Sequence, residues 1–330
     1  MSSGRDLSQE DIIAACDQLF DESVSIHERA DFLRALHRKG ERPAEIANFV
    51  EVLITRAVQP ELGSGLLDVC GTGGDKAGLF NVSTAVMFVA TACGARVVKH
   101  GNRGITSKCG GADVLEALGV KIDLPAETAL AAAGCCFLFA PVYHPAFKVI
   151  APVRKALAEE GTTSIFNMLG PLLNPARPDY QLAGVFHADL LPAYAQVFAL
   201  LGRRRAWAAH GSGGLDEVST LGPTGIHSSE PGTVRQWVLD PGKFGIPTAK
   251  LNDLRGGTGE ENAVLIEELL LGRLHGPKRD IVVLNTACAL VVAGQATDIA
   301  DGLTRAKAAL DSGKACLPLQ ALRELSHPTR

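Results

Sequence analysis

Apolar residues recur three or four positions apart over most of the first 58 residues, and this spacing is typical of amphipathic helices. A first helix is predicted to follow Ser8, whose hydroxyl suits a helix N-cap. A second apolar stripe begins at Ile26 and ends before Gly40, and a third follows Pro43. The pattern therefore predicts a small helical domain over residues 1–64.

From residue 65 onward the pattern changes to short apolar runs that end in loops, many of them rich in glycine. These runs predict strands at 66–70, 95–99, 137–140, 206–209 and 234–239, with a further short strand near Val218. Helices are predicted at 80–93, 107–118 and 281–293, and over much of 146–178. This alternation predicts an α/β domain over 65–330, with a mainly parallel central sheet flanked by helices. The helices of 146–178 are expected to pack on the helical domain.

Composition narrows the classes of protein that fit this fold. Of the 330 residues, 46% are hydrophobic and 21% are charged, as in ordinary globular proteins, and the formal net charge is −4. A negative chain has no broad basic field, so we expect no nucleic-acid partner. The apolar stretch 281–293 is too short to span a bilayer, so we expect no membrane partner. The eight cysteines form no CxxC pair and the first residues do not form a signal peptide, so we expect a cytoplasmic protein.

The first chemical signal is a glycine-rich loop that directly follows the first predicted strand. It reads Gly71-Thr72-Gly73-Gly74-Asp75, and the next helix begins within Asn81-Val82-Ser83-Thr84. Glycines let backbone N–H groups approach an anion, and a helix N-terminus adds further donors and a positive dipole. The pattern is neither GK[ST] nor GxGxxG, and an ordinary turn with a helix cap would also explain it. By itself this loop leaves both interpretations open.

A second loop of the same kind follows the next strand. Its residues are Lys99-His100-Gly101-Asn102-Arg103 and then Thr106-Ser107-Lys108. The carboxyl ends of parallel strands meet at one edge of a sheet, where ligands bind. Each side chain could instead be an ordinary surface group, but two such loops together indicate a site for a doubly charged phosphate compound.

The third signal is the adjacent acidic pair Asp216-Glu217, which follows Gly213-Gly214. Adjacent carboxylates are common on protein surfaces, and they are also the oxygen ligands that Mg²⁺ prefers. Because a diphosphate compound is usually bound with Mg²⁺, the pair is a candidate metal site. The histidines show no zinc-ligand spacing, so no zinc site is predicted.

Taken in order, these motifs resemble the anthranilate phosphoribosyltransferase family of tryptophan biosynthesis, and the resemblance covers nearly the whole chain. Besides the two loops and the acidic pair, matching segments are Ala112-Asp113-Val114-Leu115-Glu116-Ala117-Leu118-Gly119, Ala140-Pro141, His144-Pro145 and Phe166-Asn167-Met168-Leu169-Gly170-Pro171-Leu172. The resemblance implies a phosphoribosyl transfer from phosphoribosyl pyrophosphate to the amine of anthranilate, with Mg²⁺ as cofactor. It also implies a homodimer formed through the helical domain.

The resemblance also assigns residues to the two substrates and the metal. The predicted phosphoribosyl pyrophosphate site comprises Gly71, Gly74, Asp75, Asn81, Val82, Ser83, Thr84, Lys99, His100, Gly101, Asn102, Arg103, Thr106, Ser107 and Gly111. The predicted anthranilate site comprises Gly71, His100, Asn102, His144, Arg154 and Pro171. The predicted metal ligands are Ser83, Asp216 and Glu217. No covalent catalyst is expected, and Lys99 and Arg103 are the candidates for electrostatic catalysis.

The chain departs from the family pattern at several positions near these sites. Leu79 and Gly111 stand where the family commonly has hydroxyl side chains, and Thr106-Ser107 replaces a pair of serines. The segment 157–164 is about three residues longer than usual beside the expected anthranilate channel. A phosphoribosyltransferase with a different aromatic acceptor therefore stays open, as do a pyrimidine nucleoside phosphorylase and a non-catalytic relative that binds nucleic acid.

Overall fold

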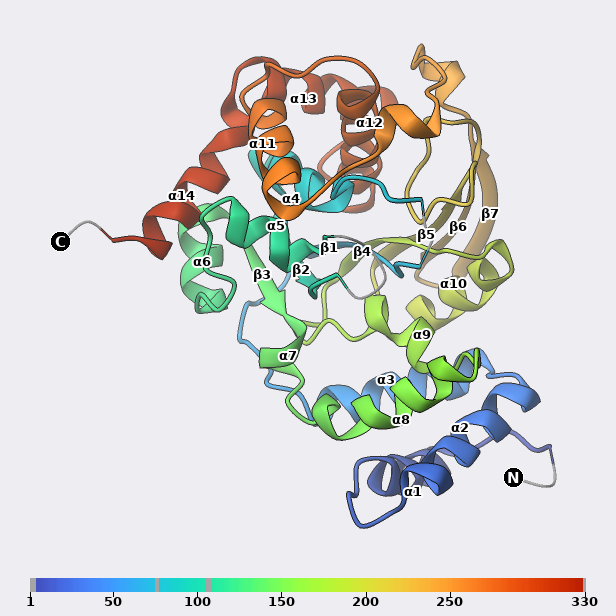
Figure 1. Ribbon diagram of the computed structural model, residues 1–330. Coiled ribbons are helices and arrows are strands. Elements are labelled where there is room, and N and C mark those ends of the chain that lie inside the picture. The colour runs from blue at the N-terminus through green and yellow to red at the C-terminus, as the bar shows by residue number, and fades with distance from the viewer. Residues whose placement is uncertain (1–3, 75–76, 105–108, 329–330) are drawn as a thin grey trace.

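The structure of the chain is a computed structural model that describes residues 4–74, 77–104 and 109–328. Its centre is a sheet of seven strands in the order β3-β2-β1-β4-β5-β6-β7 (Figure 1). Strands β1 to β5 are parallel to one another, and β6 runs antiparallel to both of its neighbours, β5 and β7. The strands are β1 (Leu66–Gly71), β2 (Arg96–Gly101), β3 (Cys135–Phe139), β4 (Tyr180–Gly184), β5 (Arg205–Gly211), β6 (Thr224–Glu230) and β7 (Thr233–Leu239).

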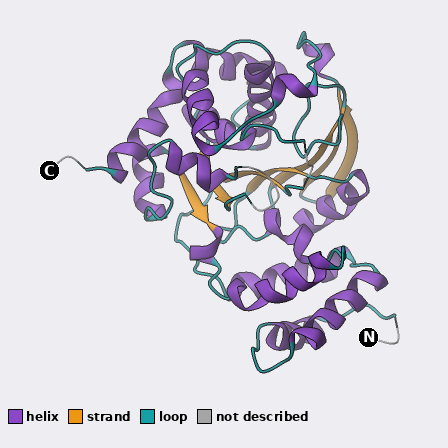
Figure 2. Cartoon of the chain, in the orientation of Figure 1, coloured by secondary structure: helices purple, strands orange, loops and turns teal. Residues whose placement is uncertain are grey.

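Helices cover both faces of this sheet, as the secondary-structure colouring shows (Figure 2). One face is covered by the helices between β1 and β3 and by those that follow β7 in the chain. This layer comprises α4 (Val82–Ala92), α5 (Gly111–Ala117), α6 (Ala126–Ala133), α11 (Gly259–Leu270), α12 (Pro277–Val292), α13 (Ile299–Asp311) and α14 (Leu317–Ser326). The core on this side is continuous from the sheet to α12 and α13. Together with the sheet it confirms the predicted α/β architecture.

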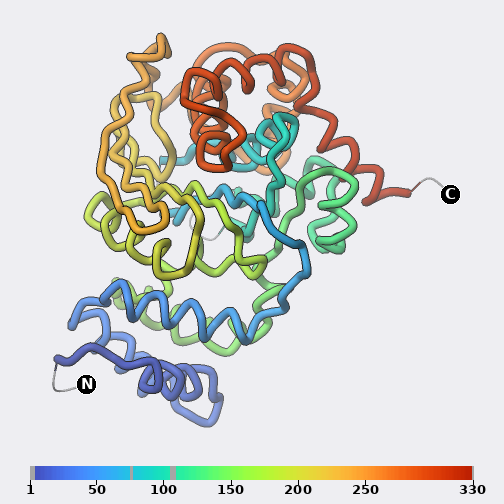
Figure 3. The backbone as a smooth tube through the Cα atoms, turned by 180° about the vertical axis from the view of Figure 1, so that it is seen from behind, coloured from blue at the N-terminus to red at the C-terminus, as the bar shows by residue number. Residues whose placement is uncertain are grey.

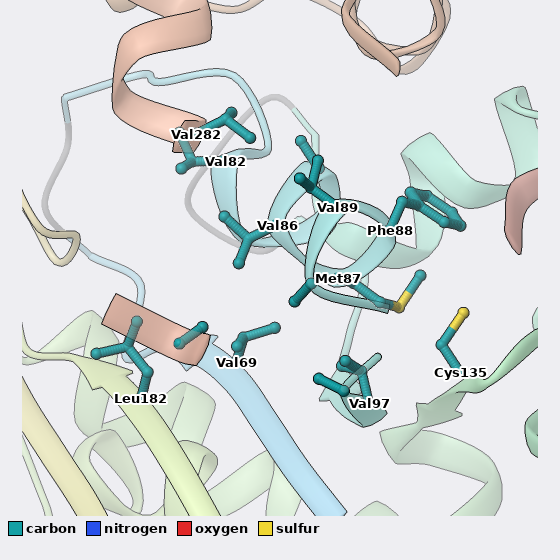
Figure 4. Packing of buried hydrophobic residues seen from close by; sticks show 14 of the residues in the cluster. Val69, Val82, Val86, Met87, Phe88, Val89, Val97, Cys135, Leu182 and Val282 are labelled. Atoms are coloured by element: carbon teal, nitrogen blue, oxygen red, sulfur yellow. The ribbon is translucent and has the colours of Figure 1, made fainter. Parts of the chain in front are cut away.

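Helix α4 is the element that joins the sheet to this layer. Nine of its residues are buried, from Val82 to Thr91, because it lies between the strands and α12. Figure 4 shows Val86 and Met87 directed toward the strand residues Val69 and Val97. An α-helix that is apolar on all sides is a buried helix, so its N-terminus is held firmly against the ends of the strands.

A helical bundle lies at one end of the molecule, away from the C-terminus (Figure 3). Its helices are α1 (Gln9–Leu19), α2 (Ile26–Lys39) and α3 (Pro43–Thr55). Ser8 caps the first helix and Pro43 occupies the first turn of the third, as the sequence predicts, and Ser25 caps the second.

The bundle shares a second core with helices from the middle of the chain. These are α8 (Phe147–Glu159), α9 (Phe166–Leu169) and α10 (Leu191–Leu200), with the short α7 (Ala140–Tyr143) leading into them. The chain alternates faces along each strand, so Ala183 joins this core and Leu182 joins the other. An ion pair between Arg34 and Glu160 at 2.8 Å also links α2 to the end of α8.

The predicted strand near Val218 is wrong. Val218 is buried, but its N–H donates to Asn285 Oδ1 at 2.9 Å and its carbonyl accepts from Asn285 Nδ2 at 2.8 Å. A side chain of α12 therefore satisfies the backbone groups that a neighbouring strand would otherwise pair. The pattern also missed β4 and β6, which lie next to β1 and β5 in the sheet.

Candidate active site

The two glycine-bearing loops leave neighbouring parallel strands at the same edge of the sheet. β1 ends at Gly71 and β2 ends at Gly101, and the two strands pair in parallel. The first loop leads into α4, whose first turn carries Ser83 and Thr84. The second loop leads into α5, which begins at Gly111. The strand ends and two helix N-termini thus face one region, which is the geometry that suits an anion.

Lys99 links these two loops. Its side chain is buried, and Nζ donates to the Val69 carbonyl at 2.8 Å and to Ser83 Oγ at 2.9 Å. A lysine of the second strand therefore reaches under the first loop to the start of α4. Because burial in a low dielectric strengthens electrostatic interactions, this ammonium is well placed to attract a phosphate group bound above it.

The acidic pair meets the first loop. The Gly73 N–H donates to Asp216 Oδ2 at 2.6 Å, across 143 positions of sequence. Two glycines make this approach possible, since a Cβ on Gly71 would lie 2.5 Å from Asp216 Oδ2 and one on Gly184 would lie 1.6 Å from the Asp216 carbonyl oxygen. Any side chain at either position would push the acidic segment away from the loop.

The second acid of the pair faces the helix that follows that loop. Glu217 and Ser83 line one small cavity, together with residues of β1, β4, β5 and α12. The glycine loop, the lysine of the next strand and the acidic pair therefore converge on one place, as the sequence analysis requires. The Ser83 hydroxyl and the carboxylates of the acidic pair are oxygen ligands of the kind that a hard cation takes, and most other side chains that line the cavity are apolar.

Arg103 has a different environment from Lys99. Its guanidinium is exposed and pairs with Asp113 at 3.1 Å and with Glu116, both on α5. These two carboxylates raise the pKa of Arg103 and already balance its charge. Of the two candidates for electrostatic catalysis, the structure thus favours Lys99.

Asp113, which the site predictions did not include, shapes the second loop. Its Oδ2 accepts N–H groups from Gly104 at 2.9 Å and Gly110 at 2.8 Å, on either side of residues 105–108. Hydrogen bonds from these backbone groups and from Arg103 hold the pKa of Asp113 below its usual range, against the effect of burial. The carboxylate closes the loop and caps α5 at the same time.

Two predicted phosphate-site residues flank the start of α5. A Cβ on Gly111 would lie 3.6 Å from Thr84 Oγ1 and 3.7 Å from Lys99 Cε, so Gly111 lies close to both side chains. The Thr84 hydroxyl is buried and has no hydrogen-bond partner among the described residues. A buried hydroxyl without a partner is costly, and a bound ligand would supply one.

The other predicted phosphate residues lie in or next to this region. Gly74 is exposed in the first loop with φ of 85°, and Val82 is buried in α4. Gly101 packs against the Phe137 ring, and Asn102 Oδ1 accepts the Arg103 N–H at 2.8 Å. The predicted residues Asp75, Thr106 and Ser107 lie outside the described residues.

A second group of predicted residues lies near the strand ends, on the side of the sheet that faces the helical bundle. The rings of His100 and His144 lie edge to face with centroids 5.2 Å apart, and His144 Nε2 lies 2.8 Å from the Leu173 carbonyl. Pro171 is buried in the short turn just before Leu173. His100 Nε2 is buried with no hydrogen-bond partner in the described part of the chain.

Burial sets the protonation of these groups. It lowers the pKa of His100 to about 3, with help from the nearby His144, and it lowers the pKa of His144 as well. Both rings are therefore neutral at neutral pH. Burial also lowers the pKa of Arg154, and no ion pair with a described carboxylate offsets it.

Arg154 lies on α8 and is connected to this group by ring contacts, because the Phe166 ring contacts Phe147 and the Phe147 ring contacts His144. Its guanidinium lies over the Phe166 ring, with Cζ 5.8 Å from the centroid. A half-buried guanidinium that stacks on an aromatic ring and lacks an acidic partner in the described chain is ready to accept a carboxylate. Arg154 is thus a half-buried cation next to an aromatic ring, without an acidic partner among the described residues.

Sequence reasoning missed Gly184 and Asn262 as well as Asp113. Gly184 ends β4, a strand that the hydrophobic pattern did not reveal, and Asn262 lies far along the chain on α11. Only Asp113 carried a usable signal, because an acidic residue three positions after a helix start commonly caps it. The described residues contain no group of three or more histidine, cysteine or acidic side chains that could hold a metal ion.

Comparison with known families places this fold and site in a class. A family described as "Glycosyl transferase family, helical bundle domain" matches residues 1–57, and "Glycosyl transferase family, a/b domain" matches residues 63–316. The fold and site thus define a glycosyl transferase that combines these two domains. Within the described residues, no helix is both long and apolar enough to cross a membrane.

Individual relatives narrow this class. The anthranilate phosphoribosyltransferase of Desulfatibacillum aliphaticivorans is 43% identical over 324 residues, which cover 97% of this chain and 95% of that protein. The enzyme of the same name from Methylorubrum extorquens is 45% identical, with 96% and 93% covered. The chain therefore belongs to the anthranilate phosphoribosyltransferase family.

Solved structures of that family have the same fold. The crystal structure of anthranilate phosphoribosyltransferase from Thermus thermophilus matches with a TM-score of 0.90 and 39% identity, covering 98% of this chain and 97% of that one. The Saccharomyces cerevisiae enzyme, solved in complex with phosphoribosyl pyrophosphate and Mg, matches with a TM-score of 0.86 and 26% identity, covering 97% and 93%. The same yeast enzyme has been solved with 4-fluoroanthranilate.

Proposed function

We propose that this chain transfers the phosphoribosyl group of phosphoribosyl pyrophosphate to the amine of anthranilate in tryptophan biosynthesis. The observation that carries the proposal is the convergence of the glycine loop, Lys99 and the Asp216-Glu217 pair at one edge of the sheet. The relatives and the yeast complexes support both substrates.

The diphosphate of the donor would lie over the two loops. Backbone N–H groups at the start of α4 and of α5 would bind its oxygens, and Thr84 would donate its otherwise unpaired hydroxyl proton. Lys99 would balance the negative charge from below. These donors are fixed before the substrate arrives, so little reorganisation is needed as charge develops in the transition state.

The residues at the convergence point fit a magnesium ion. Ser83, Asp216 and Glu217 would hold it, since all three offer hard oxygen ligands in one region. When bound, Mg²⁺ neutralises charge on the diphosphate leaving group. The Gly73 N–H keeps Asp216 oriented toward the loop, and the glycines at 71 and 184 let it approach.

Anthranilate would bind in a second subsite. Arg154 would take its carboxylate with a fork of two N–H groups, and the neutral His100 would offer its unpaired Nε2 as a hydrogen-bond partner. His144 and Pro171 would line the wall, and the exposed Asn102 would close the side nearest the donor. The buried side chains of this subsite would exclude water that would otherwise compete as the nucleophile.

The reaction is a single substitution at C1 of the ribose. The amine nitrogen of anthranilate forms a bond to C1 while the bond from C1 to the diphosphate oxygen breaks, and the nitrogen then loses a proton to solvent. Because an aryl amine is already neutral, no covalent nucleophile or strong base is required. The chain would act by placing the two substrates in line and by stabilising the leaving group.

The longer segment 157–164 bears on acceptor choice. Its residues are tied to the helical bundle, because Glu160 pairs with Arg34 and Thr163 Oγ1 lies 3.0 Å from His37 Nε2. The segment is thus anchored on α2 and follows directly from the helix that carries Arg154. A segment anchored in this way would leave the position of Arg154 on α8 unchanged, and this supports an acceptor with a carboxylate, such as anthranilate.

A fluorescence assay of anthranilate consumption tests the proposal. Purified protein with phosphoribosyl pyrophosphate and Mg²⁺ should consume anthranilate, and chelation of the metal should stop the reaction. A panel of other aromatic amines and nucleobases, and uridine with free phosphate, should react far more slowly. Turnover of uridine with phosphate, or of another acceptor in preference to anthranilate, would contradict the assignment.

The homodimer and the cytoplasmic location are proposed with the function. The apolar side chains of Ile13 and Ile26 are more than two-fifths exposed on α1 and α2, which suits contact with a second copy. All eight thiols are free and seven are buried, which suits a reducing compartment. Light scattering after size exclusion should give twice the chain mass, and a monomer mass at working concentration would contradict the dimer.

A further inference from the structure

Asn81 immediately precedes α4, yet its side chain does not cap that helix. Its Nδ2 donates to the Cys109 carbonyl at 3.2 Å, and its Oδ1 accepts from Asn262 Nδ2 at 3.0 Å and from the Cys109 thiol at 3.3 Å. The side chain is therefore fully engaged by the second loop on one side and by α11 on the other. Asn81 holds these segments together at the edge of the donor site.

Asn262 is the remote end of this connection. It is 2% exposed, and its Oδ1 accepts the Gly257 N–H at 2.8 Å. The chain of bonds has one direction only, because it begins at the Gly257 N–H, which can only donate, and ends at the Cys109 carbonyl, which can only accept. Each amide between these two ends has therefore one orientation that satisfies all its partners.

The backbone next to Asn262 supports the first loop directly. The Phe80 N–H donates to the Leu254 carbonyl at 3.2 Å, and the Gly256 N–H donates to the Gly78 carbonyl at 3.0 Å. The contact is close, since a Cβ on Gly256 would lie 2.6 Å from Phe80 Cα. Residues 254–262 thus form a buttress behind the end of the glycine loop, and we call this segment the α11 buttress.

We propose that Asn262 is a positioning residue for the phosphoribosyl pyrophosphate site, acting through Asn81. It touches neither substrate, and it fixes how the glycine loop enters α4 and hence where Ser83 and Thr84 stand. Through the Cys109 carbonyl it also sets the distance between the first and second loops. The inference rests on the proposed function, because it names the donor as the ligand.

The position of the α11 buttress predicts which substrate is affected. α11 packs on α4 and α5, the two helices whose N-termini face the donor site. Arg154 lies on α8 in the other layer, within the core that the helical bundle shares. Loss of Asn262 should therefore weaken the donor and spare the acceptor.

Asn262→Asp is the sharpest variant for a test. It keeps the shape of the side chain and the oxygen that accepts from Gly257, but it removes the donor to Asn81 and sets a carboxylate oxygen against Asn81 Oδ1. A flip of the Asn81 amide would relieve that contact only by turning its oxygen toward the Cys109 carbonyl. We expect the Michaelis constant for phosphoribosyl pyrophosphate to rise about tenfold or more, the cost of one hydrogen bond to a charged or buried partner.

The matched control is Val264→Ala on the same helix, where the side chain is 64% exposed. This control should leave both Michaelis constants and the turnover unchanged. Asn81→Ala and the double variant complete a cycle, in which the two losses should not add, because Asn262 acts through Asn81. Asn262→Ser is the substitute if the aspartate variant does not fold, as judged by circular dichroism.

Two results would overturn the inference. One is a donor Michaelis constant of Asn262→Asp equal to that of the parent protein, and the other is an equal rise for donor and anthranilate. Calorimetric titration of the parent protein with phosphoribosyl pyrophosphate and Mg²⁺ distinguishes failure of this inference from failure of the proposed function. If the parent does not bind the donor, the proposed function fails; if it binds and Asn262→Asp binds equally well, only the inference fails.

Discussion

At the scale of single residues, two cationic side chains that are close together in the sequence have opposite environments. Lys99 and Arg103 are both cationic residues of the second loop, and the sequence gives no reason to rank them. Lys99 is buried against Ser83, whereas Arg103 is exposed and paired with two acids of α5. The difference arises from which face of the strand end each residue occupies and from acids ten and more positions away. Local sequence does not contain that information.

Arg154 has the most specific of the proposed roles, that of binding the carboxylate of anthranilate. Replacement of Arg154 by alanine should raise the Michaelis constant for anthranilate about tenfold or more and change that for phosphoribosyl pyrophosphate less than twofold, because a bidentate carboxylate contact is lost. Steady-state kinetics with each substrate varied in turn measures both constants. Arg154→Lys is the control that keeps the positive charge and loses the bidentate contact. Its Michaelis constant for anthranilate should lie between those of the parent and Arg154→Ala. Equal effects on both substrates would remove Arg154 from the acceptor site.

His100 should make stability depend on pH. Burial lowers its folded-state pKa from 6.5 to about 3, so the unfolded chain binds a proton in this window and the folded chain does not. The contribution of the neutral ring to the free energy of unfolding is therefore fully present above about pH 6.5 and is lost as the pH falls toward 3. Between about pH 7.5 and pH 5 this loss amounts to about 2 kcal/mol.

The comparison with His100→Asn isolates that effect. Asp68 is buried nearby with a raised pKa, which changes stability with the opposite sign, but it is present in both proteins. The free energy of unfolding from urea titrations should therefore fall more steeply with acid in the parent than in His100→Asn. Parallel curves for the two proteins would show that His100 is not held neutral.

At the scale of elements, the sequence predicts the helices and strands whose apolar residues recur at a regular spacing. It misses strands in which polar and apolar residues are mixed. The three helices of the bundle, strands β1 and β2, and the buried α12 follow from apolar spacing and turn residues. Strand β4 was missed because Tyr180–Gly184 carries a buried glutamine, whose side chain is satisfied by Asp68 and the Pro171 carbonyl. Strand β6 alternates polar residues with few β-branched ones. Tertiary partners that the sequence does not reveal stabilise both strands.

The same limit applies to the candidate site. Both loops and the acidic pair are visible in sequence because glycines and charges cluster in short segments. Gly184 and Asn262 are not visible, since each acts on a segment from another part of the chain. Their importance follows only from the close approach of backbone to backbone and from buried hydrogen bonds.

Gly184 offers a direct test of that close approach. In Gly184→Ala the new Cβ would overlap the Asp216 carbonyl, so the acidic segment must move. We expect a loss of about 1–3 kcal/mol in the free energy of unfolding and a higher magnesium concentration for half-maximal activity. Gly225→Ala in β6 is the matched control, because there a Cβ would meet Leu191 Cδ1 only at 3.6 Å. A metal titration of Gly184→Ala that matches the parent would contradict the role of this glycine.

At the scale of the whole molecule, the proposed function assigns one substrate to each layer of helices. α4 and α5, on which α11 packs, belong to the layer whose helix N-termini would face the donor, and α8 in the other layer carries Arg154 (Figure 1). The sheet between them brings both subsites to the carboxyl ends of its strands. An attack of one substrate on the other then requires only that both be bound at the same edge.

The central claim is that the glycine loop, Lys99 and the acidic pair form one site for a magnesium-complexed diphosphate. Calorimetric titration with phosphoribosyl pyrophosphate, with and without Mg²⁺, tests it most directly on the parent protein and on the double variant Asp216→Asn, Glu217→Gln. We predict that Mg²⁺ strengthens binding to the parent about tenfold or more, and that the double variant loses most of this gain. An equal gain from Mg²⁺ in both proteins would contradict the account.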